Sequence, residues 1–125
     1  MKKETITSTR APAAIGPYSQ GIKSNRLVFT SGQLPIDPKT GQMPEGIEAQ
    51  TAQSLENVKA IIEAAETNME NVVKVLIFLK DMNDLVKMNE VYSRFFRGTC
   101  PARSCVQAAR LPKDALVEIE AIAVI

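Results

Sequence analysis

The chain contains no histidine, and this absence excludes several kinds of catalytic site. Ser-His-Asp and Cys-His catalysis both need an imidazole base, and histidine-bound metal sites are excluded with them. Only two cysteines are present, Cys100 and Cys105. They are too few for a thiolate zinc site and too close for a disulfide framework, so a reducing, cytoplasmic compartment fits best.

Excess charge and long apolar runs are missing as well. The 15 Lys and Arg residues nearly balance the 14 Asp and Glu residues, so nothing directs the chain to nucleic acid or a membrane surface. No apolar run approaches the length of a membrane span, and Met1 to Thr5 lack the apolar core of a signal peptide. With 45% hydrophobic residues, the 125-residue chain predicts one globular domain over residues 1–125.

Two helices are predicted from apolar periodicity. The stronger pattern spans Ile47 to Thr67, where apolar residues recur at helical spacing and charged residues avoid their face. The second runs from Asn83 to about Arg97, and Gly98 is a plausible end for it.

Strands are predicted before, between and after these helices. Residues 4–8 form a weak first strand, and residues 22–24 and 27–31 form a hairpin. Residues 72–80 are almost continuously apolar, which is typical of a central strand. We expect the order β-β-α-β-α-β-β, an α+β sandwich with one mixed sheet and two helices on one face.

The second face of this sheet also needs cover. The strands around residues 27–31, 75–79 and 117–124 carry apolar residues at most positions, and a chain this short has no third layer to spare. Self-association of sheet against sheet in a closed ring is therefore predicted.

The last two strands carry the residues that suggest chemistry. Residues 101–106 and 117–120 are predicted to pair as antiparallel strands joined by a turn around Pro112-Lys113-Asp114. This pairing would bring Arg103 and Glu118 to one end of the sheet. An arginine fork binds a carboxylate bidentately, and a glutamate can position water or move a proton. The pair suggests chemistry on small carboxylic acids.

Several segments resemble the reactive-intermediate deaminase (Rid) family, and its RidA subgroup in particular. They are Pro12 to Gly21, Thr30 to Gln33, Pro101 to Val106 and Val117 to Glu120. The resemblance covers essentially the whole chain and implies a chorismate-mutase-like fold. It also implies a homotrimer with ligand sites in clefts between subunits.

The same resemblance implies a reaction. Proteins of the RidA subgroup hydrolyse 2-imino acids (2-iminobutanoate, 2-iminopropanoate) or their enamine tautomers (2-aminoacrylate) to 2-oxo acids and ammonia. They thereby clear reactive intermediates released by pyridoxal-phosphate-dependent dehydratases. The reaction implies neither a metal nor an organic cofactor, because simple imines already hydrolyse in water and need only orientation and a positioned carboxylate.

The resemblance also assigns roles to individual residues. It implies that Arg103 binds the substrate carboxylate, while Glu118 and the main-chain carbonyl of Cys105 hold the attacking water. The residues implied to line the cleft are Tyr18, Ser31, Gly32 and Asn89.

Other interpretations of these residues exist. Arg103 could be a solvated strand arginine, and spacing alone does not separate Glu118 from Glu120, which lies on the same strand face. Cys105 could be a nucleophile, but a small buried residue is favoured because no histidine is available to activate the thiol. Tyr18 could be a packed aromatic, and Asn89 an ordinary residue of a helix surface.

Two other functions compete with deamination. One is a non-catalytic trimer that binds small ligands or acts in regulation, in purine regulation or in a chaperone-like role. The other is a ribonuclease, which the lack of histidine, of a basic stripe and of an aromatic stacking platform disfavours.

Overall fold

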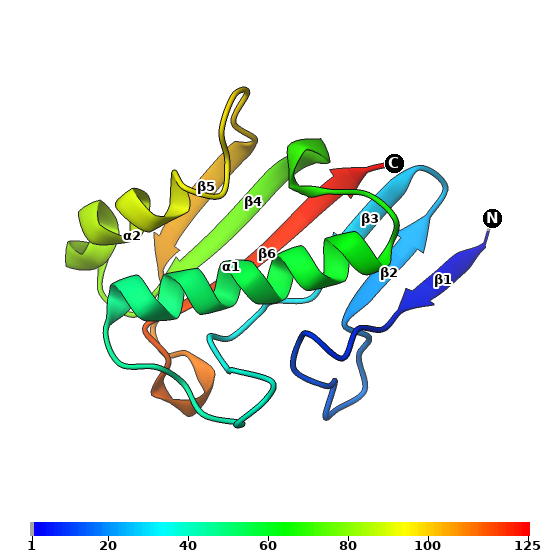
Figure 1. Ribbon diagram of the computed structural model, residues 1–125. Helices are drawn as coiled ribbons and strands as arrows, with labels where there is room; N and C mark the ends of the chain where they lie inside the picture. Colours follow the sequence, from blue (N-terminus) through cyan, green and yellow to red (C-terminus); the bar gives the residue numbers. More distant parts are fainter. Residues whose placement is uncertain (1) are drawn as a thin grey trace.

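A computed structural model describes residues 2–125 as one mixed sheet with two helices packed on one face (Figure 1). The strands are β1 (Lys3–Ile6), β2 (Gly21–Ser24), β3 (Leu27–Thr30), β4 (Val72–Leu79), β5 (Ala102–Gln107) and β6 (Val117–Val124). The helices are α1 (Ile47–Ala64) and α2 (Leu85–Tyr92), and the sheet order is β1-β2-β3-β6-β4-β5. The α+β class and the position of the helices on one face are confirmed. None of the helices in residues 2–125 is long and apolar enough to cross a membrane.

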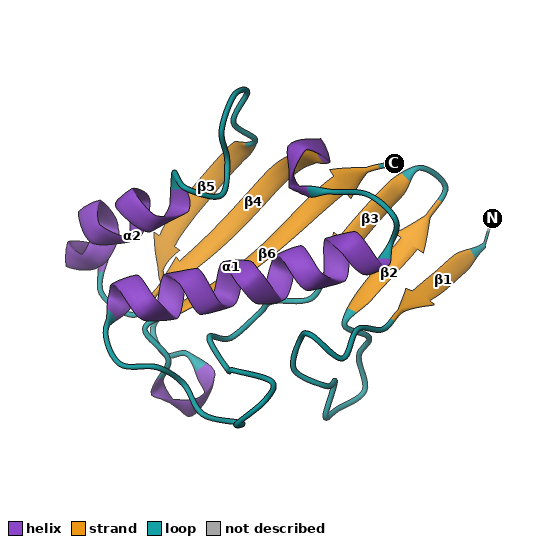
Figure 2. Ribbon diagram, viewed as in Figure 1, coloured by secondary structure: helices purple, strands orange, loops and turns teal. Residues whose placement is uncertain are grey.

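The first three strands form an antiparallel meander at one side of the sheet (Figure 2). The chain order is therefore β-β-β-α-β-α-β-β, with one more strand than the predicted order contains. The strand that this order left out is β1, which overlaps the weak first strand predicted at residues 4–8; its Lys3, Glu4 and Thr5 are exposed while Ile6 alone is buried. Such a short edge strand buries little apolar surface, so its alternating pattern is weak and its predicted bounds are shifted towards the C-terminus.

Helix α1 lies across the sheet and supplies much of the core. It begins at Ile47, as predicted, but ends at Ala64, before the predicted Thr67. Glu66 follows with a left-handed φ of 66°, which stops the helix there. Leu55, Val58 and Ile62 are completely buried against the sheet, as their spacing predicts.

Strands β4 and β5 with α2 between them form a parallel βαβ unit. Helix α2 is shorter than the predicted span from Asn83 to Arg97, because a 3₁₀ turn (Met82–Asp84) precedes it and the helix ends at Tyr92. The Asp81 side chain accepts a hydrogen bond of 2.9 Å from the Asn83 N–H and caps the 3₁₀ turn.

The predicted hairpin of β5 and β6 is wrong. Strand β4 lies between them, and it pairs with β5 in parallel and with β6 antiparallel. The reason is the crossover through α2, which returns β5 beside β4 and leaves β6 to pair on the other side of β4. The turn chemistry at Pro112 marks a 3₁₀ turn between the two strands but does not decide which strands become neighbours.

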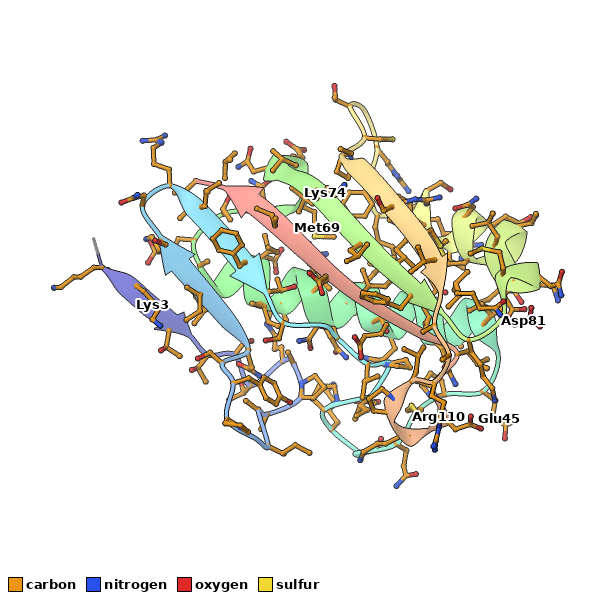
Figure 3. The ribbon with its side chains drawn as sticks, turned by 180° about the vertical axis from the view of Figure 1, so that it is seen from behind. Lys3, Glu45, Met69, Lys74, Asp81 and Arg110 are labelled. Carbon is orange, nitrogen blue, oxygen red and sulfur yellow. The ribbon has the colours of Figure 1, made fainter. Side chains whose placement is uncertain are left out.

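The face of the sheet opposite the helices has no cover within residues 2–125. Figure 3 looks onto this face, with α1 behind the sheet. Leu27, Phe29 and Val106 are among the exposed large apolar side chains, at 39%, 38% and 45% exposure. Phe29 pairs with Ile122 of β6, so the apolar surface continues from one strand to the next. This arrangement is what the nearly continuous apolar strands predicted.

Candidate active site

The structure separates the predicted site residues into two groups, and it adds Tyr92, which was not predicted, to the first. The arginine group, on α2 and β5, consists of Asn89, Tyr92, Arg103 and Cys105. The glutamate group, on β6 and the loops beside it, consists of Tyr18, Ser31, Gly32 and Glu118.

Arg103 and Glu118 face opposite sides of the sheet. Arg103 is the register partner of Val75, which is buried beneath the helices, whereas Glu118 is the partner of Phe78. Successive residues of a strand point to opposite faces, so positions 75 and 78 face different sides. The expectation that one chain brings Arg103 and Glu118 together at one end of a hairpin is therefore wrong.

The guanidinium of Arg103 is held by two residues of α2. Its Nη1 donates a hydrogen bond of 2.8 Å to Oδ1 of Asn89. Its Cζ lies 4.8 Å from the centre of the Tyr92 ring, in a cation–π contact. Among residues 2–125, Arg103 forms no salt bridge, so its charge remains available for an anion.

Tyr92 lies within the predicted second helix, but its contact with Arg103 was not predicted. A signal was present, because Asn89 and Tyr92 are three residues apart and so share one face of α2. The sequence alone does not reveal that this face meets β5. That contact depends on the parallel crossover.

Glu118 is half-buried beside Gly32. A Cβ placed on Gly32 would lie 2.5 Å from Oε2 of Glu118, so a larger residue at position 32 would displace the carboxylate from its present position. Burial raises the pKa of Glu118, and the nearby charge of Glu120 raises it further. A carboxyl with a raised pKa is suited to exchange protons near neutral pH.

The loop that carries Gly32 is fixed on both sides. Gln33 and Ile119 exchange two backbone hydrogen bonds, of 2.7 and 3.1 Å, which keep the loop against β6. Ser31 donates from Oγ to the Ser19 carbonyl at 2.5 Å, and its N–H donates to the Gln20 carbonyl. These bonds connect the loop around Gly32 to the segment that contains Tyr18.

Tyr18 is 51% exposed, so it is not packed in the core of the single chain. The neighbouring Gln20 is buried, and its side-chain nitrogen donates to the carbonyls of Ser8, Ala11 and Pro12. Gln20 thereby holds the preceding loop in place and leaves the Tyr18 ring at the surface.

Cys105 lies on the helix side of β5, like Arg103. Burial raises the pKa of the Cys105 thiol, and the Arg103 charge offsets only part of this effect. A thiol of this kind is a poor nucleophile. The main-chain carbonyl of Cys105 is better placed than its thiol to contact a ligand. Ala108 N–H donates to the Leu79 carbonyl of β4 at 2.8 Å, and the backbone groups of successive residues point to alternate sides of the strand. The Cys105 carbonyl, three residues before Ala108, therefore points away from β4 to the free edge of the sheet.

Comparisons with known proteins place the chain in a family. The profile of the family described as Endoribonuclease L-PSP matches residues 8–125. A 2-iminobutanoate/2-iminopropanoate deaminase of Salmonella typhimurium is 56% identical over 124 residues, with 97% of each chain covered. The chain belongs to the Rid family. A RutC family protein of Pyrococcus horikoshii is 57% identical over 122 residues, again with 97% of each chain covered.

Solved structures of Rid proteins have the same fold. TdcF of E. coli, crystallised with bound serine, gives a TM-score of 0.95 at 50% identity, with 98% of each chain covered. RidA of an Antarctic Psychrobacter gives a TM-score of 0.95 at 46% identity, covering 98% of this chain and 99% of that one. The family resemblance expected from the sequence motifs is confirmed over nearly the full length.

Proposed function

We propose that this Rid protein hydrolyses 2-imino acids, such as 2-iminobutanoate and 2-iminopropanoate, and the enamine 2-aminoacrylate, to 2-oxo acids and ammonia. The observation that carries the proposal is an arginine without a salt-bridge partner in residues 2–125, in a chain 56% identical over nearly its full length to an imine deaminase. Its role would be to clear reactive intermediates that pyridoxal-phosphate-dependent dehydratases release.

Each step of this reaction needs only groups that the chain supplies. Arg103 binds the carboxylate, and Glu118 with the Cys105 carbonyl holds a water molecule beside C2. The water oxygen bonds to C2 while Glu118 moves one water proton to the nitrogen, which gives a carbinolamine. The remaining hydroxyl proton then reaches the nitrogen through Glu118 as the C–N bond breaks, so that C=O forms and ammonia leaves.

We further propose that the site forms between subunits of a homotrimer. Arg103 and Glu118 lie on opposite faces of the sheet, so the arginine group of one subunit must meet the glutamate group of another. The uncovered apolar face supports such association, since exposed Leu27 and Phe29 would be buried by a neighbouring sheet. A closed ring of three uses the same heterologous contact three times.

A ligand of one relative supports the proposed class of substrate. TdcF binds serine, which carries a carboxylate beside a nitrogen-bearing carbon, as a 2-imino acid does. Both cysteines of this chain are free, which fits a reducing compartment, and we propose the cytoplasm. The description of the family as an endoribonuclease names a different activity. That activity finds no support here, because the sequence lacks histidine for general acid–base work on RNA.

The proposal is tested by turnover. 2-Iminobutanoate is generated in place by an amino-acid oxidase, and release of 2-oxobutanoate is followed with and without the protein. We expect hydrolysis faster than the spontaneous reaction, with ammonia and 2-oxobutanoate in equal amounts. No acceleration at any protein concentration would leave the non-catalytic binding role as the better interpretation.

The role of Arg103 is tested by Arg103→Lys, which keeps the charge but loses the planar two-donor fork. A charge-assisted bond of this kind contributes about 1.5–3 kcal/mol, so kcat/KM for 2-iminobutanoate should fall about ten- to a hundred-fold. Arg110→Lys is the matched control, because Arg110 is exposed in the loop after β5. Equal values for wild type and Arg103→Lys would remove Arg103 from the site.

A further inference from the structure

The arginine of the proposed site has an aromatic support that no motif assigns. Arg103 uses one N–H on the Asn89 side chain, and one face of its guanidinium lies on the Tyr92 ring. Asn89 and Tyr92 together restrain both the position and the plane of the fork. The remaining N–H groups are left to an incoming carboxylate.

Tyr92 is placed for this role by its ring and not by its hydroxyl. The residue is 7% exposed, and its ring packs on Phe96 with centroids 4.6 Å apart. The buried hydroxyl has no hydrogen-bond partner among residues 2–125. Burial raises the pKa of Tyr92 to about 12 although the Arg103 charge acts in the opposite direction, so the phenol stays neutral and its ring makes a cation–π contact with Arg103.

We propose that Tyr92 is the positioning residue for substrate carboxylate recognition: its ring fixes the plane of the Arg103 guanidinium so that the free N–H groups present a preformed fork. The inference rests on the proposed function and deepens it. It separates two neighbouring aromatic residues of similar burial, because the Tyr92 ring contacts the Arg103 cation, whereas the Phe96 ring packs on the Tyr92 ring.

The proposal predicts a specific kinetic signature. The carboxylate does not change during hydrolysis, so the fork binds it equally in the ground state and the transition state. Weakening such uniform binding raises KM and leaves kcat nearly unchanged. General damage to the fold would instead reduce the amount of active protein and lower the apparent kcat.

The experiment compares Tyr92→Leu with Phe96→Leu, which both remove one buried ring at the same end of α2. We expect Tyr92→Leu to raise KM for 2-iminobutanoate about three- to thirty-fold, the range that a cation–π contact spans, with kcat within about two-fold of wild type. Phe96→Leu should leave KM within about two-fold. Tyr92→Phe should have the KM of the wild type, because it keeps the ring and removes only a hydroxyl without a hydrogen-bond partner.

Calorimetric titration with 2-oxobutanoate measures carboxylate binding by the Arg103 guanidinium without turnover. The Kd for 2-oxobutanoate should rise in Tyr92→Leu by the same factor as KM. Tyr92→Met fills the space without a π face and replaces Tyr92→Leu if that variant does not fold. The positioning role would be overturned if Tyr92→Leu and Phe96→Leu gave the same KM and the same Kd, or if Tyr92→Leu lowered kcat alone. If the wild-type protein shows no turnover but the Kd for 2-oxobutanoate still differs between Tyr92→Leu and Phe96→Leu, only the proposed hydrolysis is rejected. If the wild-type protein also fails to bind 2-oxobutanoate, both the hydrolysis and the positioning role of Tyr92 are rejected.

Discussion

Glu118 and Glu120 lie two residues apart on β6 and face the same side of the sheet, yet their surroundings differ. Glu118 is half-buried against Gly32, and Gly32 is held there by the bridge between Gln33 and Ile119. Burial, and then the charge of Glu120, raises the pKa of Glu118. At the scale of single residues, Glu118 thus differs from Glu120 in its surroundings. The spacing of the two residues along the strand does not reveal this difference.

The first prediction concerns these two carboxylates. Glu118→Gln keeps the shape of the side chain but takes no proton, so kcat should fall about a hundred-fold or more. Glu120→Gln should keep most of kcat. A larger loss at Glu120 would show that Glu120 is the reacting carboxylate.

Glu120→Gln should also change the pH profile in a defined direction. The Glu120 charge raises the pKa of Glu118, so removing that charge lowers the pKa. Glu118 holds water as a carboxylate, and activity should therefore persist to lower pH in Glu120→Gln than in wild type. A kcat–pH profile checks this, and a shift to higher pH would contradict it.

Cys105 provides a test of main-chain against side-chain chemistry. The proposed role uses only its backbone carbonyl, and burial raises the pKa of the thiol. Cys105→Ala should therefore retain wild-type kcat within about three-fold, because the alanine keeps the carbonyl and no thiolate is needed. A folded but inactive Cys105→Ala would instead identify the thiol as a nucleophile.

At the scale of elements, α1 connects to the site through buried polar side chains. Asn57 is completely buried and donates two hydrogen bonds, to the carbonyls of Leu34 and Ile36. Those residues follow Gly32 and Gln33 in the loop beside Glu118. Helix α1 therefore fixes the loop as well as covering the sheet.

Asn57→Leu should show how much this anchoring contributes. The change leaves two partly buried carbonyls without their partner, so the free energy of unfolding should fall by about 2–4 kcal/mol. Urea unfolding measures this, with Glu56→Gln as the control because Glu56 is exposed on the other side of α1. A loss below about 0.5 kcal/mol would show that the loop does not depend on Asn57.

At the scale of the whole molecule, the division of the site residues between two faces leads to a complementation test. Arg103→Lys and Glu118→Gln chains, each with a kcat/KM at least about ten-fold below wild type, are unfolded, mixed equally, refolded and assayed at substrate concentrations well below KM. In a cyclic trimer, about one interface in four pairs an intact arginine group with an intact glutamate group. Activity should return to about a quarter of wild type.

The control for this experiment mixes two variants of the same group. Arg103 and Asn89 are hydrogen-bonded within one chain, so Arg103→Lys and Asn89→Ala damage the same side of each interface. Their mixture should remain at the level of its parents. Recovery in the control, or its absence in the first mixture, would contradict a site shared between subunits.

Much of the architecture follows from local patterns. Apolar spacing predicted α1 from Ile47 and the buried strand β4, and the nearly continuous apolar strands predicted a sheet face without cover. These features depend on a periodicity of 3.6 or 2 residues, which the sequence displays directly. The motifs around Arg103 and Glu118 likewise indicated the family.

Tertiary structure decided which of these residues meet. Turn residues at Pro112 suggested a hairpin, but the crossover through α2 placed β4 between β5 and β6 and put Arg103 and Glu118 on opposite faces. The same crossover brought Tyr92 to Arg103. The sequence by itself determined the helices, the central strand and the chemical groups, because these are local. Strand neighbours and the face that each group occupies are set by long-range packing, which no local pattern contains.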